Sequence, residues 1–276
     1  MAIELVTKYM PVVDEMFTTE SKKSLITNQD FNWAGAKSVK VYKINTAEMR
    51  DYTRNDDTGA NRFGTPKDLS ATTEEMTLKK DRAFTYVIDK MDSDETGGAL
   101  QGASSLARQL REVVIPEVDT YTYGIMVANA GTKAQAVEVT EENIYDLICE
   151  ANKVLDDAEV LESGRVLIVT PETLRIMKKS KEIILETEIG QDMRLKGVVS
   201  NLDGAAVVKV PANRLPSKFG FMLAHSCATV APTKLEDYRI HQDPPGISGV
   251  LVEGRVVYDA FVLDNKAKAI YYQATI

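Results

Sequence analysis

The segment LQGASSLARQLREVVIPEVDTYTYGIMVANAG, residues 100–131, decides the fold because its apolar side chains recur at helical spacing over its whole length. Leu106, Leu110 and Val114 mark this apolar face, and the same phase continues beyond Pro116 until Gly131 ends it. Proline removes a backbone donor and crowds the preceding turn, so we expect one long helix with a kink at Pro116. With a rise of 1.5 Å per residue, such a helix would run on the order of 45 Å, which is longer than a compact small domain needs.

Two strand-like stretches precede this helix and flank a polar loop. Residues 38–44 and residues 74–89 both alternate apolar and polar side chains, the pattern of a half-buried strand. Between them, residues 49–68 are rich in Arg, Asp, Asn and Gly, which is typical of a loop. Apolar residues are too sparse here for a private core, and an isolated long hairpin is marginally stable in water. We therefore expect the hairpin to lie on another surface, in its own subunit or in a neighbour.

The N-terminal segment has a similar shortage of apolar surface. Residues 11–26 predict a short helix. Its thin apolar face consists of Val12, Val13, Met16 and Phe17. Such a segment cannot bury itself.

The second half of the chain indicates an ordinary α/β region. Thr140 with two following glutamates begins a helix whose apolar face runs from Ile144 to Leu155. A strand follows at residues 165–169, and Thr170 caps the next helix with Pro171 at its first position. Further strands are expected at residues 205–210, 250–262 and 268–272. No period of 20 to 50 residues emerges, so repeat architectures are not expected.

Composition narrows the class of protein. The 276 residues carry a net charge of -8, and their length predicts one large or two modest domains. No apolar run approaches the roughly 18 residues of a membrane span, and early charged residues argue against a signal peptide, so a soluble protein is expected. Two cysteines, Cys149 and Cys227, are too few for a disulfide framework, which favours a reducing compartment. The acidic balance weighs against tight nucleic-acid binding, because phosphate contacts need clustered Lys and Arg.

The histidines do not predict catalysis. His225 precedes Ser226 and Cys227, but adjacent residues in a strand or helix point in different directions and are poorly placed for proton transfer. We expect His225 and His241 to be satisfied by the backbone or by water. Carboxylates such as Glu236, Asp237 and Asp243 remain the candidates if the protein is an enzyme.

Metal and phosphate motifs are also incomplete. The start of a calcium-binding loop is imitated by Asp92, Asp94, Thr96 and Gly97. The twelfth position of that loop is Ala103, which cannot supply the required carboxylate, so a solvated acidic turn before the long helix is favoured. The glycine-rich residues 97–102 lack the Gly-Lys-Ser/Thr of a phosphate loop. No metal and no cofactor are predicted.

Two features remain open at this point. A polar ligand site could be formed by Asn55, Asp56, Asp57 and Asn61 with Arg54 and Arg62, and the plainer interpretation is an exposed loop tip. Trp33, the only tryptophan, could anchor an interface or pack in the core.

The order of elements resembles that of the tailed-phage major capsid proteins of the Hong Kong 97 type. A thin N-terminal arm, a polar-tipped hairpin, a long helix and an α/β region with a closing hairpin follow one another in both. The resemblance rests on Asp51-Tyr52-Thr53-Arg54, on residues 78–89 and 114–121, and on residues 259–266 and 269–272. It covers nearly the whole chain.

This resemblance implies an α+β capsid fold with four parts. Residues 1–38 would form the N-terminal arm, and residues 39–94 the extended loop and its strand base. Residues 95–164 would form the spine helix and peripheral domain, with the closing strands 250–276 returning to it. Residues 165–249 would form the axial domain.

The resemblance also implies function. The protein would be a coat subunit, not an enzyme, that assembles with itself into hexamers and pentamers of an icosahedral shell enclosing double-stranded DNA. A separate scaffold, a portal and decoration proteins would be further partners, and the protein would be made in the host cytoplasm and reside in the virion. The inter-subunit contacts expected from the arm and loop are Tyr9, Phe17, Arg54, Asp56, Asp57, Arg62 and Phe63.

Two alternatives stay open. An encapsulin-like compartment uses the same fold to enclose cargo enzymes, and the helix and loop do not separate it from a phage capsid. A carboxylate-dependent soluble enzyme is the remote alternative.

Overall fold

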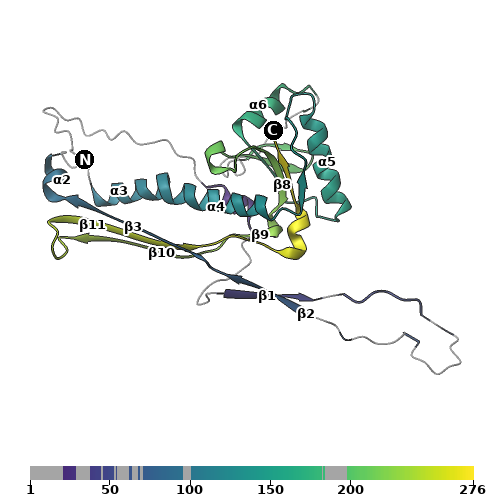
Figure 1. Ribbon diagram of the computed structural model, residues 1–276, viewed down its shortest axis with the longest axis horizontal. Coiled ribbons are helices and arrows are strands. Elements are labelled where there is room, and N and C mark those ends of the chain that lie inside the picture. The colour runs from purple at the N-terminus through teal and green to yellow at the C-terminus, as the bar shows by residue number, and fades with distance from the viewer. Residues whose placement is uncertain are drawn as a thin grey trace. The chain divides into compact units, whose positions relative to one another are not determined.

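A computed structural model describes residues 21–28, 38–44, 46–52, 54, 62–63, 68, 71–95, 101–181, 183 and 198–276. The chain divides into two compact units. The first, here called the body, comprises Met1–Asn32 and Lys79–Ile276, and the second, here called the hairpin unit, is Trp33–Leu78. Figure 1 shows their helices and strands.

The hairpin unit is built on two antiparallel strands. β1 (Ser38–Ile44) pairs with β2 (Ala71–Thr77) in an unbroken register from Ser38 opposite Thr77 to Ile44 opposite Ala71. The expected strand at residues 38–44 is confirmed. The single strand expected at residues 74–89 is wrong, because β2 ends at Thr77 and β3 (Lys80–Asp89) pairs within the body instead.

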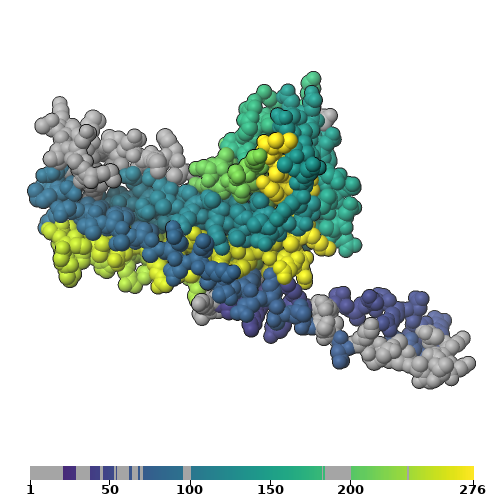
Figure 2. All heavy atoms as spheres, in the orientation of Figure 1, coloured from purple at the N-terminus to yellow at the C-terminus, as the bar shows by residue number. Residues whose placement is uncertain are grey.

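The body contains a three-stranded antiparallel sheet. β11 (Gly249–Tyr258) lies in the middle, with β10 (Thr233–Gln242) and β3 on its two sides. The short helix α2 (Lys90–Glu95) follows β3. In Figure 2, the side chains of β10 and β11 (yellow-green) lie directly against those of β3 and the helices that follow it (blue to teal).

The expected long helix is present. It consists of α3 (Gly102–Gln109), the π-helical turn η1 (Leu110–Val114) and α4 (Ile115–Ala128), and it runs along the three-stranded sheet (Figure 1). Directly before Pro116 lies η1, in which the amide of Ile115 donates to the carbonyl of Leu110, five residues back. Pro116 has no N–H to donate to the carbonyl of Glu112, four residues back, so the α-helical bonding pattern is interrupted at this turn. The kink stays a prediction.

A six-stranded sheet forms the rest of the body. Its strands follow the order β4 (Thr132–Ala134), β13 (Ile270–Ala274), β8 (Phe219–His225), β5 (Arg165–Val169), β7 (Ala205–Lys209) and β6 (Val198–Leu202). Every residue of β5 and β8 is buried, which requires cover on both faces. α5 (Ile144–Asp157) and α6 (Pro171–Lys179) cover one face, and the other packs against Tyr123 and Met126 of α4.

Short elements complete the described chain. They are α1 (Lys23–Ile26), the 3-10 turns η2 (Ala212–Arg214), η3 (Ser226–Ala228) and η4 (Asp264–Ala269), and the paired strands β9 (Thr229–Val230) and β12 (Phe261–Val262). In the part of the chain that the structure describes, no helix is both long and apolar enough to cross a membrane.

The two sheets divide the chain differently from the expected domains. The expected boundary between residues 164 and 165 separates α5 from β5, although Ile148 of α5 and Leu167 of β5 belong to one hydrophobic cluster. The closing strands at residues 250–276 belong to two different sheets. β11 joins the three-stranded sheet and β13 joins the six-stranded one. Sheet membership, set by long-range pairing, does not follow chain order here.

Gly254, in the central strand of the three-stranded sheet, leaves room for aromatic rings from the two strands beside it. The rings of Phe84 and Tyr238 stack 6.3 Å apart across Gly254, which pairs with both residues. A Cβ atom at Gly254 would overlap the ring of Phe84, and that ring is held by stacking on Tyr86 as well.

We expect Gly254→Ala to lower the free energy of unfolding of the subunit by about 1–3 kcal/mol, the usual effect of overpacking. The matched control is Gly124→Ala in α4, where nothing lies within 4 Å of the added atom. The control should raise stability by about 0.5–1 kcal/mol because alanine is the better helix former. Urea titration of unassembled subunits measures both, and equal effects at the two glycines would contradict the expectation.

Candidate assembly surfaces

The expected contact residues fall into two groups. Tyr9, Phe17, Asp56 and Asp57 lie outside the described residues, as does Trp33. Arg54, Arg62 and Phe63 are described, and all three are exposed in the loop that joins β1 to β2. The structure therefore locates three of the seven expected contacts, all in the loop, and leaves the two arm residues and the two loop aspartates as expectations.

The loop between β1 and β2 presents two aromatic rings. Tyr52 and Phe63 meet edge to face with their ring centroids 5.0 Å apart, although eleven residues separate them in the sequence. Phe63 is 80% exposed and Tyr52 is 49% exposed. Large aromatic side chains on rigid supports are the usual anchors of protein interfaces. Tyr52 was not among the expected contacts, although an aromatic residue in a polar loop was the available signal.

The hairpin unit has little apolar packing of its own. Neither of the two hydrophobic clusters formed by the described residues includes a residue from this unit. Tyr42 and Met49 are also exposed, at 72% and 98%. Two ion pairs join the strands: Lys40 with Glu75 at 3.8 Å and Lys43 with Glu74 at 3.1 Å. The pair of Lys40 and Glu75 is exposed and contributes little, whereas the side chains of Lys43 and Glu74 are only 20% and 16% exposed. A two-stranded hairpin is still marginally stable by itself, so we expect it to depend on further contacts.

A cluster of polar side chains binds the chain at Lys79, the first residue of the body after the hairpin unit. The carboxylate of Asp259 accepts hydrogen bonds from the amide of Lys79 and from the hydroxyl of Tyr121, both at 2.8 Å. Burial, together with the bond to Asp259, raises the pKa of Tyr121 to about 12, so this hydroxyl stays a donor at physiological pH. Next to it, Glu117 accepts from Arg82 at 2.8 Å and from Tyr258 at 3.0 Å. The start of β3 is thereby tied to α4 and to the end of β11.

One face of the three-stranded sheet carries alternating charges. Arg255 donates to Asp81 at 2.9 Å, Arg239 pairs with Asp237 at 2.9 Å, and His241 lies 3.4 Å from Glu253. A hollow of about 530 Å³ lies among them, lined in part by the small residues Ala83, Thr85 and Gly254. The opposite face receives α3, where the hydroxyl of Ser105 donates to the hydroxyl of Tyr86 at 2.9 Å. The charged face is a polar surface suited to a protein partner.

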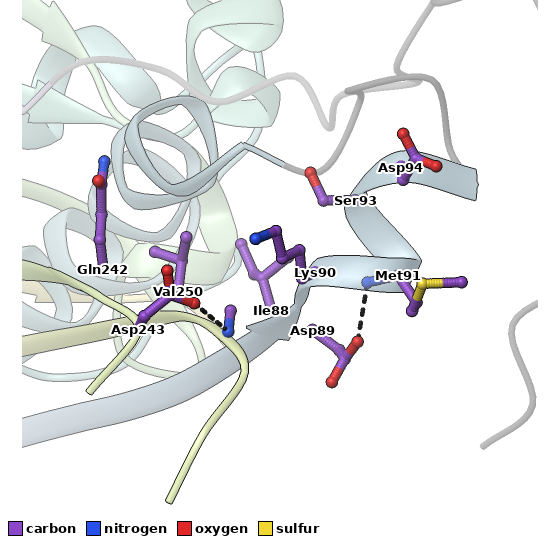
Figure 3. A pocket seen from close by; sticks show the side chains of 10 residues that line it. Ile88, Asp89, Lys90, Met91, Ser93, Asp94, Gln242, Asp243 and Val250 are labelled. Carbon is purple, nitrogen blue, oxygen red and sulfur yellow. Dashed lines mark hydrogen bonds between the residues drawn. The ribbon is translucent and has the colours of Figure 1, made fainter. Parts of the chain in front are cut away.

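A second hollow, of about 580 Å³, lies where β3 ends and α2 begins (Figure 3). Asp89 accepts from the amide of Met91 at 2.8 Å, and Asp243 accepts from the amide of Gly249 at 3.1 Å. These carboxylates cap local turns, as carboxylates commonly do. Asp92 and Asp94, the start of the imitated calcium loop, lie in helix α2. Among the described residues, no group of three or more acidic, histidine or cysteine side chains could hold a metal ion.

The candidate catalytic side chains do not lie close to one another. His225 is buried, with Nδ1 accepting from the amide of Cys227 at 3.1 Å and Nε2 lying 2.8 Å from the carbonyl of Ser163. Glu236 and Asp237 are neighbours on β10 and therefore point to opposite faces. Asp243 caps the turn at the far end of that strand. This arrangement satisfies each group structurally and brings none of them to a common reacting position.

Protein-family models and curated proteins offer no match to this chain. Solved structures do match along its length. A chain from Mycobacterium phage Che8 superposes with a TM-score of 0.74 at 18% identity, covering 98% of this chain and 96% of that one. The capsid structure of the Cyanophage P-SCSP1u gives a TM-score of 0.71 at 13% identity, with 96% and 90% covered.

A virus-like particle from Pyrococcus furiosus is a weaker match. Its TM-score is 0.52 at 10% identity, and 86% of each chain is covered. The phage structures therefore resemble this chain over more of its length and more closely. The α+β capsid architecture expected from the sequence is confirmed: this chain has the fold of tailed-phage capsid proteins.

Proposed function

We propose that this protein is a major capsid protein, a coat subunit that assembles with itself into the hexamers and pentamers of an icosahedral shell enclosing double-stranded DNA. The observation that carries the proposal is the hairpin unit, whose described residues enter no hydrophobic cluster and whose loop exposes Tyr52 and Phe63. The whole-length likeness to phage capsid structures supports it.

The physical reason for assembly is unburied surface. A long hairpin is marginally stable alone, and obligate interfaces commonly bury more than about 2,000 Å². Arg54, Arg62 and Phe63 would then lie at contacts between subunits, with Tyr52 beside Phe63. For the arm, Tyr9 and Phe17 remain the proposed contacts, and Asp56 and Asp57 complete the loop.

The remaining parts of the proposal concern partners and place. A net charge of -8 suits a shell that encloses DNA without adhering to it. A scaffold, a portal and decoration proteins are the further partners proposed, and the virion is the proposed location after synthesis in the host cytoplasm. The proposed role is structural and not enzymatic, which agrees with the separate hydrogen bonds of His225 and Asp243 to the backbone.

We also propose revised boundaries for the peripheral and axial parts of the subunit. The long helix with the three-stranded sheet would form the peripheral part, and the six-stranded sheet with α5 and α6 the axial part. Shared packing supports this division, since α5 and β5 contribute to one hydrophobic cluster. Residues 1–32 would form the arm and the hairpin unit, residues 33–78, the extended loop, in place of the expected residues 1–38 and 39–94.

An encapsulin-like compartment is the second candidate. The match to the virus-like particle favours it, but with a TM-score of 0.52 against 0.74 for the phage chain. The contents of shells isolated from the native source separate the two, because a phage capsid holds DNA and a compartment holds cargo protein. Genes for a terminase and portal beside this one would favour the phage.

The direct test is assembly. Purified protein, alone or with a scaffold, is expected to form closed shells or capsomers visible by negative-stain microscopy. The reason is that the loop of the hairpin unit exposes Tyr52 and Phe63, which gain further apolar cover only from another surface. A protein that stays strictly monomeric at high concentration would contradict the proposal.

A further inference from the structure

The first described residues of the chain form a short strap across the body. Ile26 is 1% exposed and belongs to the hydrophobic cluster between α4 and the six-stranded sheet. The amide of Asn28 donates to the carbonyl of Thr229 at 2.7 Å, which adds the strap to β9. Residues 26–28 are thus held by the core and by the backbone.

Ahead of Ile26, the strap is held by side chains alone. Lys22 donates to the carbonyl of Lys209 and Lys23 to the hydroxyl of Thr233, each at 3.2 Å. Both are long, flexible side chains, and burial lowers the pKa of each ammonium group. Such contacts alone define the direction of a chain poorly, because many side-chain conformations satisfy them.

Ser21 makes the one short contact at this end of the described segment. Its hydroxyl donates to Oδ1 of Asp119 at 2.6 Å, while Arg214 donates to Oδ2 of the same carboxylate at 2.8 Å. Asp119 is 2% exposed on α4, so without Ser21 it would keep a buried oxygen with one partner fewer. Tyr123, one turn further along α4, has a buried hydroxyl with no hydrogen-bond partner among the described atoms, so it does not bond Asp119 while Ser21 does.

We propose that Ser21 is a positioning residue: its bond to Asp119 fixes the point of the described strap at which the proposed arm begins, and shell assembly depends on that bond. The second clause rests on the proposed function. Arg214 holds the carboxylate of Asp119 in place, so the bonded Ser21 takes the same position in every subunit.

The test compares two serines of the same strap. Ser21→Asp places a negative charge against Asp119, whereas Ser24→Asp places the same charge on an exposed position of α1. Limited trypsin digestion of unassembled subunits releases the arm by cutting after Lys22 or Lys23, which mass spectrometry identifies as chains starting at Lys23 or Ser24. We expect Ser21→Asp to be cut at least about tenfold faster than Ser24→Asp, and Ser21→Ala a few-fold faster, because a buried carboxylate loses its partner.

Assembly is measured on the same proteins. The lowest protein concentration that yields shells should rise at least about threefold for Ser21→Asp over Ser24→Asp, measured at a temperature below the unfolding midpoints of both variants, of which that of Ser21→Asp is expected to be the lower. If the two variants are cleaved at the same rate, the bond of Ser21 to Asp119 does not anchor the strap. If Ser21→Asp is cleaved faster but assembles like Ser24→Asp, that bond has no role in shell assembly. If the unaltered protein forms no shells, the proposed function and the assembly clause both fail, while the cleavage ratio still decides the anchor.

Discussion

Arg214→Met is expected to lower the free energy of unfolding of the subunit by about 3–5 kcal/mol, since breaking a buried ion pair strands the other charge. Arg214 and Asp119 are 2.8 Å apart, and their side chains are 5% and 2% exposed. Burial raises the pKa of Asp119, while the hydrogen bond from Ser21 and the charge of Arg214 oppose that rise. Urea titration of unassembled subunits, followed by far-UV circular dichroism, measures the loss.

The direction in which the effect of Arg214→Met changes with pH follows from the pKa of Asp119. Without Arg214, the pKa of this carboxyl in the folded subunit should rise further above its ordinary value. In the Arg214→Met variant, the stabilisation that comes from protonated Asp119 is fully present below the ordinary carboxyl pKa. It is lost as the pH rises through the raised pKa of Asp119 in the folded subunit. The deficit of Arg214→Met should therefore shrink on acidification.

Two controls make the prediction specific. Arg239→Met removes an exposed partner of Asp237 and should change stability by no more than about 1 kcal/mol. The double variant Asp119→Leu with Arg214→Met should recover most of the loss, because it leaves no charge buried without a partner. If Arg214→Met and Arg239→Met have the same effect, the inner pair is not buried as described.

The second large effect is expected in the loop of the hairpin unit. Tyr52→Ser combined with Phe63→Ser should abolish shell formation and lower the stability of the unassembled subunit only slightly. Both rings are exposed in the subunit, so their removal costs only the contact between them, about 0.5–1.5 kcal/mol, whereas an interface anchor contributes about 2 kcal/mol or more. With two anchors lost from every copy, the concentration needed for assembly should rise beyond the accessible range.

The control for this prediction removes exposed apolar surface elsewhere. Leu161 is 69% exposed in the body, and Leu161→Ser should assemble like the unaltered protein. Deletion of residues 56–66, which removes Arg62 and Phe63 together, should match the double serine variant by negative-stain microscopy. Normal shells from either loop variant would show that the loop is not an interface.

Local sequence patterns predicted many of the helices and strands. The capping oxygen of Thr170 accepts from the amide of Thr173, as a threonine before Pro171 leads one to expect. The helical phase through Pro116 predicted a single long helix, and the missing proline donor interrupts its α-helical bonding pattern. These signals are short-range, since capping and periodicity involve residues within a few turns of each other.

The candidate surfaces were predicted only in part. Phe63, Arg54 and Arg62 could be named from the polar loop, but the partner ring of Phe63, Tyr52, depends on how the two arms of the loop meet. The break between β2 and β3 was missed because Met76 and Leu78 share the alternating phase of Phe84, Tyr86 and Ile88, although Lys80 and Arg82 interrupt the apolar positions between them. Only the pairing of β3 with β11, from the far end of the chain, assigns those two halves to different units.

The sequence by itself determined the local elements, the acidic charge and a hairpin too poor in apolar residues to stand alone. Tertiary structure alone decided that Asp119 meets Arg214, 95 residues away, and that β11 lies between β3 and β10. The physical reason is that periodicity specifies which face of an element is apolar but not which other face covers it. That choice depends on burying all the apolar faces and pairing all the buried charges at once, and it involves residues from the whole chain.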